Sequence, residues 1–161
     1  MNTIHLPPRS AFKTAGQFYG GASHELAHWS GTPERLNRET LNESYRFGDL
    51  AYAKEELRAE LASVFLLAER GIPHNPDTHA AYLSAWVKIL RNDQHEIFRA
   101  ARDAHRAADL LIALEHHKSI ADALAYINEQ SMPGAHTAPH PESQIPRLMA
   151  SRENPGLEMD F

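Results

Sequence analysis

Two histidines four residues apart, with a glutamate between them, form the segment of this sequence best suited to chemistry. The segment His24-Glu25-Leu26-Ala27-His28 has the pattern H-E-x-x-H. Residues four apart in a helix lie one turn apart on one face, so both imidazoles can bind one metal ion. Glu25 would flank the open coordination position, take a proton from an activated water and pass it to a leaving group. The pattern predicts hydrolysis with Zn²⁺, and the alternative is a helix with two surface histidines.

A hydrolytic zinc site needs a third protein ligand, and a later acidic segment supplies candidates. On a helical wheel with Glu56 at 0°, Glu60 lies at about 40° and the apolar residues lie between about 80° and 140°. Glu55 falls at about 260°, which predicts a place on the solvent side. Glu56 and Glu60 share an edge of the buried face, so either one can be the third ligand. The alternative is an exposed acidic edge supported by Lys54 and Arg58.

The elements that must position these residues are helices, because apolar residues recur at helical spacing through most of the chain. Ser119 and Asp122 resemble a capping box for the last of them. Residues 2–6 alternate polar and apolar side chains and are expected to form one short strand. Gly31 is expected as the residue that ends the first helix. The helices are predicted over residues 16–29, from 32–34 onward for a short one, over 49–70, from 75–77 to about 90, from 92–93 to about 117, and over 119–130.

Composition limits the class of protein. The 161 residues suit one domain, and the absence of cysteine excludes disulfides, cysteine-based zinc sites and thiol nucleophiles. The formal net charge of −5 argues against a general polyanion binder. The sequence shows neither a membrane span nor a signal peptide, so a cytoplasmic protein is expected. Residues 1–130 are predicted to form the domain, and residues 131–161, with five of the ten prolines, a tail.

Several ordered motifs together resemble a known family. They are Ser23–Gly31, Arg35–Arg38, Phe47–Asp49, Tyr52–Glu60, His79–Tyr82 with Trp86, Asn92-Asp93 and Ala107–Asp109. In this order they resemble the zincin-like metallopeptidase domain of the ArdC-type antirestriction proteins, over roughly residues 2–112. Those proteins are encoded on plasmids, phages and related mobile elements. The fold that the resemblance implies is mainly α, a compact zincin-like helical domain with at most a small N-terminal β element.

The resemblance also implies roles for the acidic residues. Glu56 corresponds to the third zinc ligand, and Glu60 to an acceptor for the free N–H of a ligand histidine. The reverse assignment stays open, since the wheel places Glu60 slightly further inward. The implied activity is hydrolysis of a peptide or protein substrate by a zinc metallopeptidase, linked to antirestriction or mobile-element biology.

The relation to nucleic acid is a separate expectation. Family members carry a single-stranded-DNA-binding domain before the peptidase domain, and this chain is expected to lack it. No direct binding of nucleic acid or membrane by this chain is therefore expected, and the sequence does not specify an oligomeric state. The alternatives are a catalytically silent zincin-fold module that masks a host defence protein, and a DNA-protection factor that needs a separate DNA-binding domain.

Three residues with helical spacing add candidates near the site. His79, Tyr82 and Trp86 share one face of a predicted helix. His79 or Tyr82 can donate a hydrogen bond to the oxyanion of a tetrahedral intermediate, with Tyr52 a weaker candidate for the same role. Trp86 is expected to pack in the core.

Overall fold

The protein folds as a set of helices. The computed structural model describes residues 3–42, 50–73 and 80–132, and for residues 80–82 it describes the helix without the side chains. A 3-10 turn, η1 (Arg9–Ala11), precedes six α-helices in these ranges, and none of the described residues forms a strand. The helices are α1 (Ala15–Ser30), α2 (Glu39–Asn42), α3 (Leu50–Glu69), α4 (Ala80–Asn92), α5 (Glu96–Ala113) and α6 (Ile120–Gln130).

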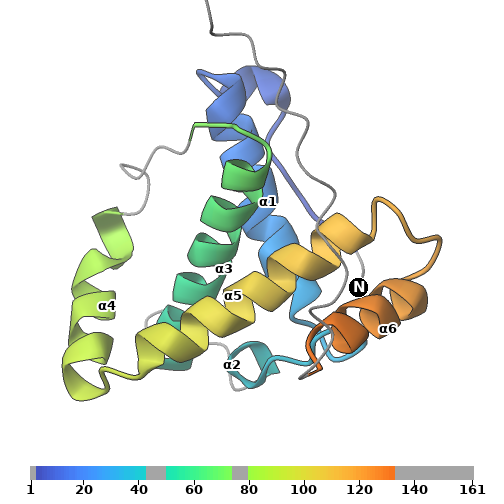
Figure 1. The fold of residues 1–161 in the computed structure, drawn as a ribbon. Coiled ribbons are helices and arrows are strands. Elements are labelled where there is room, and N and C mark those ends of the chain that lie inside the picture. The colour runs from blue at the N-terminus through green and yellow to red at the C-terminus, as the bar shows by residue number, and fades with distance from the viewer. Residues whose placement is uncertain (1–2, 43–49, 74–79, 133–161) are drawn as a thin grey trace, which may run out of the picture.

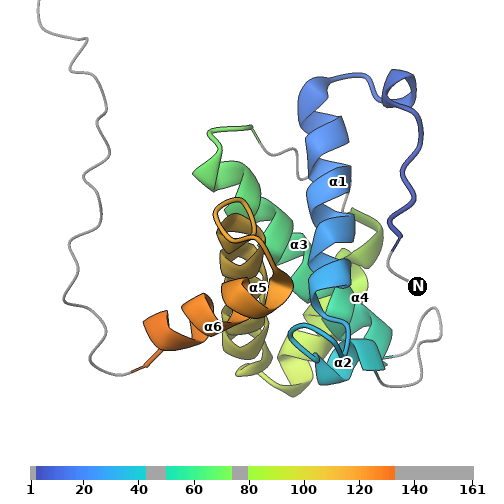
Figure 2. The same ribbon diagram turned by 90° about the vertical axis from the view of Figure 1, so that its right-hand side faces the viewer.

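Helix α3 is the centre of the fold. It contacts α1, α2, α4 and α5, while α6 packs on α5 (Figure 1). Helices α1 and α3 run side by side in opposite directions, as the turned view also shows (Figure 2). Ser63 in the second half of α3 donates to the carbonyl of Gly20 at 3.2 Å, whereas Glu56 in its first half faces His28. This pairing brings the histidine motif of α1 against the acidic segment of α3.

Small residues fill the place where α1, α3 and α5 meet. The alanines there are at most 1% exposed, and a tightly packed interior of alanines brings helix backbones close together. Ala27 directly precedes His28, and Ala59 directly precedes Glu60. The close approach therefore sets the short distances between the imidazoles of α1 and the carboxylates of α3. The alanines are Ala27, Ala59, Ala62, Ala104 and Ala107.

Most of the expected helices are confirmed. Helix α6 begins as its sequence predicts, since the Ser119 hydroxyl accepts a hydrogen bond from the Asp122 backbone N–H at 3.1 Å. Helix α3 ends before Gly71, whose φ of +62° is the left-handed conformation that favours glycine. Trp86 is 9% exposed and its indole N–H donates to the Ala53 carbonyl at 3.1 Å, which confirms its place in the core.

One of the two expectations for the end of α1 and the segment after it is wrong. Residues 32–36 form turns instead of a short helix, because the backbone N–H groups of Asn37 and Arg38 return to the carbonyls of Thr32 and Gly31. Gly31 ends α1 as expected, but its φ of −84° is not the left-handed conformation for which glycine is needed. It is needed for space: a Cβ there would collide with the Arg38 guanidinium.

The remaining differences concern element ends and the N-terminus. Helix α5 begins at Glu96, three residues after Asp93, because the Asp93 side chain accepts from the His95 backbone N–H in a turn. Residues 3–6 form no strand, and the predicted helix start at 75–77 lies outside the described residues. The predicted tail lies outside them from residue 133 onward. Within the described ranges no helix has the length and apolarity needed to cross a membrane.

Candidate metal centre

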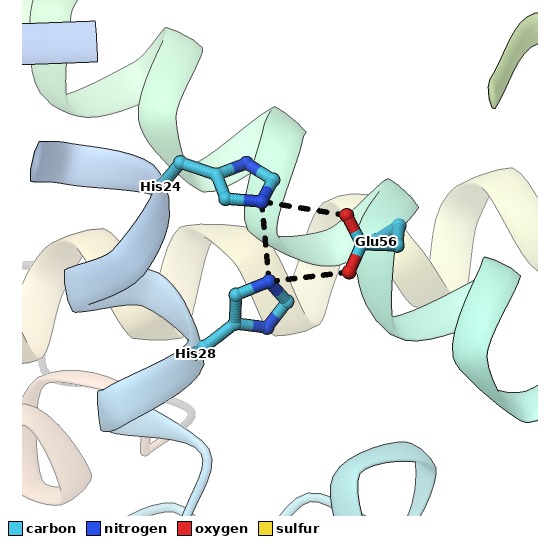
Figure 3. A group of neighbouring side chains, drawn as sticks. All are labelled: His24, His28 and Glu56. Carbon is cyan, nitrogen blue, oxygen red and sulfur yellow. Dashed lines mark hydrogen bonds and ion pairs between the residues drawn. The ribbon is translucent and has the colours of Figure 1, made fainter. Parts of the chain in front are cut away.

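Three side chains from α1 and α3 converge on one point. The Nε2 atoms of His24 and His28 lie 3.1 Å apart. The Glu56 carboxylate faces both rings, with Oε2 3.4 Å from Nε2 of His24 and Oε1 3.4 Å from Nε2 of His28 (Figure 3). One ligand atom from each residue fits within 4.8 Å of the other two. The three residues thus form a compact group of nitrogen and oxygen donors.

The spacing of these donors fits a small metal ion. Ligand atoms about 2.0–2.1 Å from a tetrahedral Zn²⁺ are separated from one another by about 3.3 Å. The two imidazole nitrogens here lie 3.1 Å apart, and each lies 3.4 Å from the nearer oxygen of Glu56, a different oxygen for each ring. The histidine side chains are 21% and 16% exposed, so solvent reaches the group, while Glu56 is nearly buried at 6%. The group has the size and the access that a ligand set with an open position requires.

The other ring nitrogen of each histidine faces a second carboxylate. Nδ1 of His24 lies 3.4 Å from Oε2 of Glu60, and Nδ1 of His28 lies 3.3 Å from Oε1 of Glu55. A carboxylate at this position favours the tautomer that carries its proton on Nδ1. The Nε2 lone pairs then point toward the shared centre, where two lone pairs and a carboxylate meet. Such a donor set suits a cation.

Glu55 is fixed by more contacts than its neighbours. It is completely buried, and its Oε2 accepts from Nε of Arg38 at 3.1 Å and from the Thr40 hydroxyl at 2.6 Å. Oε1 of Glu55 accepts from Nη2 of Arg38 as well as facing His28. Both oxygens of Glu55 are therefore engaged away from the central point, which leaves Glu56 as the carboxylate that faces both imidazoles.

The charges at the site do not balance. Glu55, Glu56 and Glu60 are at most 6% exposed, and Arg38 is the buried guanidinium beside them. Counting only these described groups, with neutral histidines, three carboxylates and one guanidinium give a net charge of −2. Uncompensated buried charge is costly, so a divalent cation would neutralise what this arrangement leaves over.

The surplus of negative charge also shifts the pKa values of the site residues. Burial alone would lower the pKa of His24, but the Glu56 and Glu60 carboxylates outweigh it and raise this pKa to about 9. The pKa of His28 is also raised, because Glu55 and Glu56 outweigh the effect of burial. Burial would raise the pKa of Glu56, but its contacts with the two imidazoles hold that pKa well below the usual range. In the metal-free protein, protons on the histidines therefore take the place of a cation.

The remaining predicted residues are described only in part. Glu25 is exposed on α1 next to His24, where solvent reaches it. Tyr82 lies in α4, but its side chain and all of His79 lie outside the described residues. Their predicted roles as hydrogen-bond donors thus stay predictions, as does the catalytic role of Glu25. Glu60 lies beside His24, on the side away from the shared centre, where the resemblance places an acceptor.

The position of Glu55 is where the sequence reasoning was wrong. The helical wheel puts Glu55 on the solvent side, yet the segment that ends in α2 covers this face of α3 and buries it.

The alternative of an exposed acidic edge is wrong for the same acidic segment, since Glu56 and Glu60 are 4% and 6% exposed. Arg58 does not support that edge either, because it binds Glu96 and Asp103 of α5. A buried arginine such as Arg38 needs an acceptor, and Glu55 is that acceptor, but the burial of Arg38 is seen only in the structure.

Comparisons with known proteins agree with this geometry. The model of a family of zincin-like metallopeptidases matches residues 1–103 of this chain. Two Escherichia coli proteins named DNA primase TraC are 49% and 45% identical over 114 residues, which is 71% of this chain and 10% and 8% of theirs. The protein y4eC of Sinorhizobium fredii is 38% identical over 68% of this chain and 35% of its own length. This chain thus spans about a tenth or less of the TraC relatives.

Solved structures point to the same group. The antirestriction protein ArdC of plasmid R388 has a crystal structure in an Mn(II)-bound form and another in a metal-free form. Both match this chain with a TM-score of 0.58 and 36% identity, over 76% and 78% of this chain and 41% of ArdC. From the match over residues 1–103, we conclude that the chain belongs to the zincin-like metallopeptidase family.

Proposed function

We propose that this chain is a metal-dependent peptidase domain that holds one Zn²⁺ ion through His24, His28 and Glu56. The observation that carries the proposal is the convergence of these donors, 3.1 to 3.4 Å apart, in a site with two surplus negative charges. Two imidazoles and one carboxylate form a ligand set of catalytic zinc sites. The Mn(II)-bound form of ArdC supports a divalent ion in this fold.

The choice of Zn²⁺ follows from the ligands. Imidazole nitrogens suit Zn²⁺, whereas sites for Mn²⁺ are richer in oxygen donors, and Zn²⁺ binds more tightly than Mn²⁺ to most such sets. We expect Zn²⁺ to bind at least about tenfold more tightly than Mn²⁺. A bound ion would supply Lewis acidity, which lowers the pKa of a coordinated water and polarises a carbonyl group.

The residues of the chain have separate tasks in this proposal. Glu25 is the general base, because it adjoins His24 in α1 and is exposed to solvent. Glu60 and Glu55 hold the Nδ1 protons of His24 and His28 and thereby orient both rings. Glu56 faces both rings and holds negative charge at neutral pH. Tyr82 and His79 are proposed as donors to the oxyanion of the intermediate.

A Glu25→Gln variant tests the peptidase proposal. The wild-type chain loaded with Zn²⁺ is incubated with a mixed peptide library, and new termini are counted by mass spectrometry. Glu25→Gln should bind Zn²⁺ within about twofold of wild type and lose cleavage by about 100-fold or more. The exposed Glu129→Gln on α6 serves as control and should cleave normally. A Glu25→Gln variant with full activity would refute the role of Glu25.

A second candidate is a binding module that masks a partner protein without cleaving it. The observation in its favour is that the metal-free form of ArdC matches this fold as well as the Mn(II)-bound form does. A fold that persists without metal can serve as a binding surface. Absence of any cleavage by the Zn²⁺-loaded wild type, together with an intact metal site, would favour this candidate.

The setting we propose is that of a mobile genetic element. The matched relatives are an antirestriction protein of a plasmid and two proteins named DNA primase TraC. A peptidase domain of this kind would act on a protein of the host defence, or on a protein that accompanies incoming DNA. We propose no direct binding of nucleic acid by this chain alone, and a gel-shift assay with single-stranded DNA at moderate salt tests this.

A further inference from the structure

The two histidines of the site are supported in unequal ways. On one side, Glu60 faces Nδ1 of His24. On the other side, Glu55 faces Nδ1 of His28 and is itself held by a buried arginine, Arg38. The support of His28 thus extends from α3 into the segment between α1 and α2.

Arg38 occupies a place that the local backbone prepares for it. Asn37 has a φ of +47°, a left-handed conformation that asparagine tolerates, and it turns the chain back toward α1. The N–H of Arg38 donates to the Gly31 carbonyl at 2.9 Å, which closes the turn. Gly31 lacks a Cβ, and the guanidinium lies in the space where that atom would be.

The guanidinium joins the end of α1 to Glu55. Its Nη2 donates to the Ala27 carbonyl at 2.7 Å, and its Nη1 donates to the Ser30 hydroxyl at 2.9 Å. Its Nε and Nη2 donate to the two oxygens of Glu55. Arginine presents these donors in a rigid plane, so the orientation of the Glu55 carboxylate is fixed relative to α1, the helix that carries His28.

Two consequences for the metal site follow from this fixed orientation. Oε1 of Glu55 is held 3.3 Å from Nδ1 of His28, which keeps the proton on that nitrogen and the Nε2 lone pair toward Glu56. Glu55 is also adjacent in sequence to Glu56, and a free Glu55 carboxylate could compete with Glu56 for the ion. Arg38 and Thr40 engage Glu55 elsewhere and leave Glu56 in place.

We propose that Arg38 is a positioning residue of the metal site: by holding Glu55, it fixes the tautomer of His28 and selects Glu56 as the metal-binding carboxylate. This inference rests on the metal site proposed above and does not depend on peptidase activity. It assigns the turn from Gly31 to Arg38 a role in metal binding, although no residue of that turn is proposed as a ligand.

Arg58 provides a matched control for Arg38. Both arginine side chains are 6% exposed, and both bind buried carboxylates, but Arg58 binds Glu96 and Asp103 on the other side of α3. We would compare Arg38→Met and Arg38→Lys with Arg58→Met and Arg58→Lys in the full chain. Zn²⁺ affinity is measured by competition with a chelator, the His28 tautomer by long-range ¹H–¹⁵N spectra of the Zn²⁺-loaded protein, and folding by thermal melting.

The proposal expects a weaker metal site in the Arg38 variants alone. Arg38→Met should raise the Kd for Zn²⁺ by about 10- to 100-fold and alter the ring signals of His28 more than those of His24. Arg38→Lys keeps the charge without the planar pair of donors and should raise the Kd for Zn²⁺ several-fold. This variant provides the test if Arg38→Met does not fold. The Arg58 variants should melt earlier and keep the Kd within about twofold.

The outcomes separate this inference from the proposed function. Arg38 variants with the Kd and the His28 signals of wild type would overturn the role of Arg38 while leaving the metal site intact. An equal loss of affinity in the Arg58 variants would also overturn it, because the effect would then reflect stability in general. A wild-type chain that binds no Zn²⁺ would overturn the metal site itself and this inference with it.

Discussion

Helix α3 carries two buried polar networks, and their difference separates a binding site from a structural contact. On the side toward α5, Arg58 donates to Glu96 at 2.7 Å and to Asp103 at 2.8 Å. On the side toward α1, the buried guanidinium of Arg38 binds Glu55. Glu56 and Glu60 instead face histidine rings. The two networks start from the same helix and a similar degree of burial.

The two networks differ in whether charge is balanced within the protein. Glu96 accepts from both Arg58 and Arg99, so each buried carboxylate of the α5 side has a guanidinium partner. On the α1 side, the described groups Glu55, Glu56, Glu60 and Arg38 have a net charge of −2 when the histidines are neutral. A network that balances its own charges needs nothing further, whereas one with surplus charge requires protons or a cation from solvent. The surplus therefore distinguishes the metal site from an equally buried structural network.

The largest effect is expected from breaking the balanced network. Arg58→Met leaves Glu96 with Arg99 alone and removes the Arg58 partner of Asp103, and should lower the free energy of unfolding by about 3 kcal/mol. Urea denaturation of the metal-free chain measures this. Zn²⁺ affinity of the folded fraction should stay within about twofold. A loss of affinity that matched the loss of stability would show that the two networks are not separate.

The next effect concerns pH in the metal-free protein. The pKa of His24 is raised from 6.5 to about 9 in the folded protein, so its protonation stabilises the fold below pH 6.5 and this contribution is lost as the pH rises to about 9. We expect the free energy of unfolding to fall by on the order of 1–3 kcal/mol across this range.

Added Zn²⁺ should reverse this trend. The metal replaces the protons, and its binding strengthens as the pH rises. Urea denaturation at pH 6.5 and 9, with chelator and with Zn²⁺, measures both trends. A metal-free stability that is constant over this range would contradict the view that protons balance the surplus charge.

A smaller effect is expected from the turn that supports only the α1 side. Gly31→Ala places a methyl group where the Arg38 guanidinium lies, and the φ of −84° adds no backbone strain. We expect the Kd for Zn²⁺ to rise about tenfold, or about 1.4 kcal/mol. Gly20→Ala is the control on the same helix, since its Cβ would lie 3.9 Å from Leu67, an ordinary contact. Equal Kd values for Zn²⁺ in the two variants would contradict the role of Arg38 in metal binding.

The smallest effect calibrates the comparison at a place remote from both networks. Ser119→Ala removes the cap of α6 and should lower the free energy of unfolding by about 1 kcal/mol. The Kd for Zn²⁺ should not change, because α6 packs mainly on α5, whereas the donors lie on α1 and α3. Calorimetric melting and chelator competition measure the two quantities. A changed Kd would mean that metal affinity follows overall stability.

The helical architecture was predictable because it depends on local signals. Apolar spacing predicted α3 and α5, the capping box of Ser119 and Asp122 predicted α6, and Gly71 marked an end that the structure confirms. The meeting of His24 and His28 with the acidic segment was likewise predictable, because the i, i+4 spacing and the acidic segment each present donors on one helix face. The choice of Glu56 over Glu60 came from the family resemblance, since the helical wheel left both open. What each of these residues does with a metal stays a prediction.

The rest depended on contacts between segments far apart in sequence. A helical wheel ranks residues by the apolar stripe of one helix, so it cannot show that the turn after α1 covers Glu55. Nor can it show that Gly31 makes room for Arg38, since that requires the turn to close first. Buried polar networks cannot be predicted by a method that treats charged residues as exposed.

The central claim is that the α1 side of α3 carries a charge surplus built for one divalent cation. Its most direct test is titration of the metal-free chain with Zn²⁺, with bound metal measured by elemental analysis and a His24→Ala variant beside it. We expect about one Zn²⁺ per wild-type chain and close to none for the variant. Fewer than about 0.2 Zn²⁺ per wild-type chain, or equal binding by His24→Ala, would contradict it.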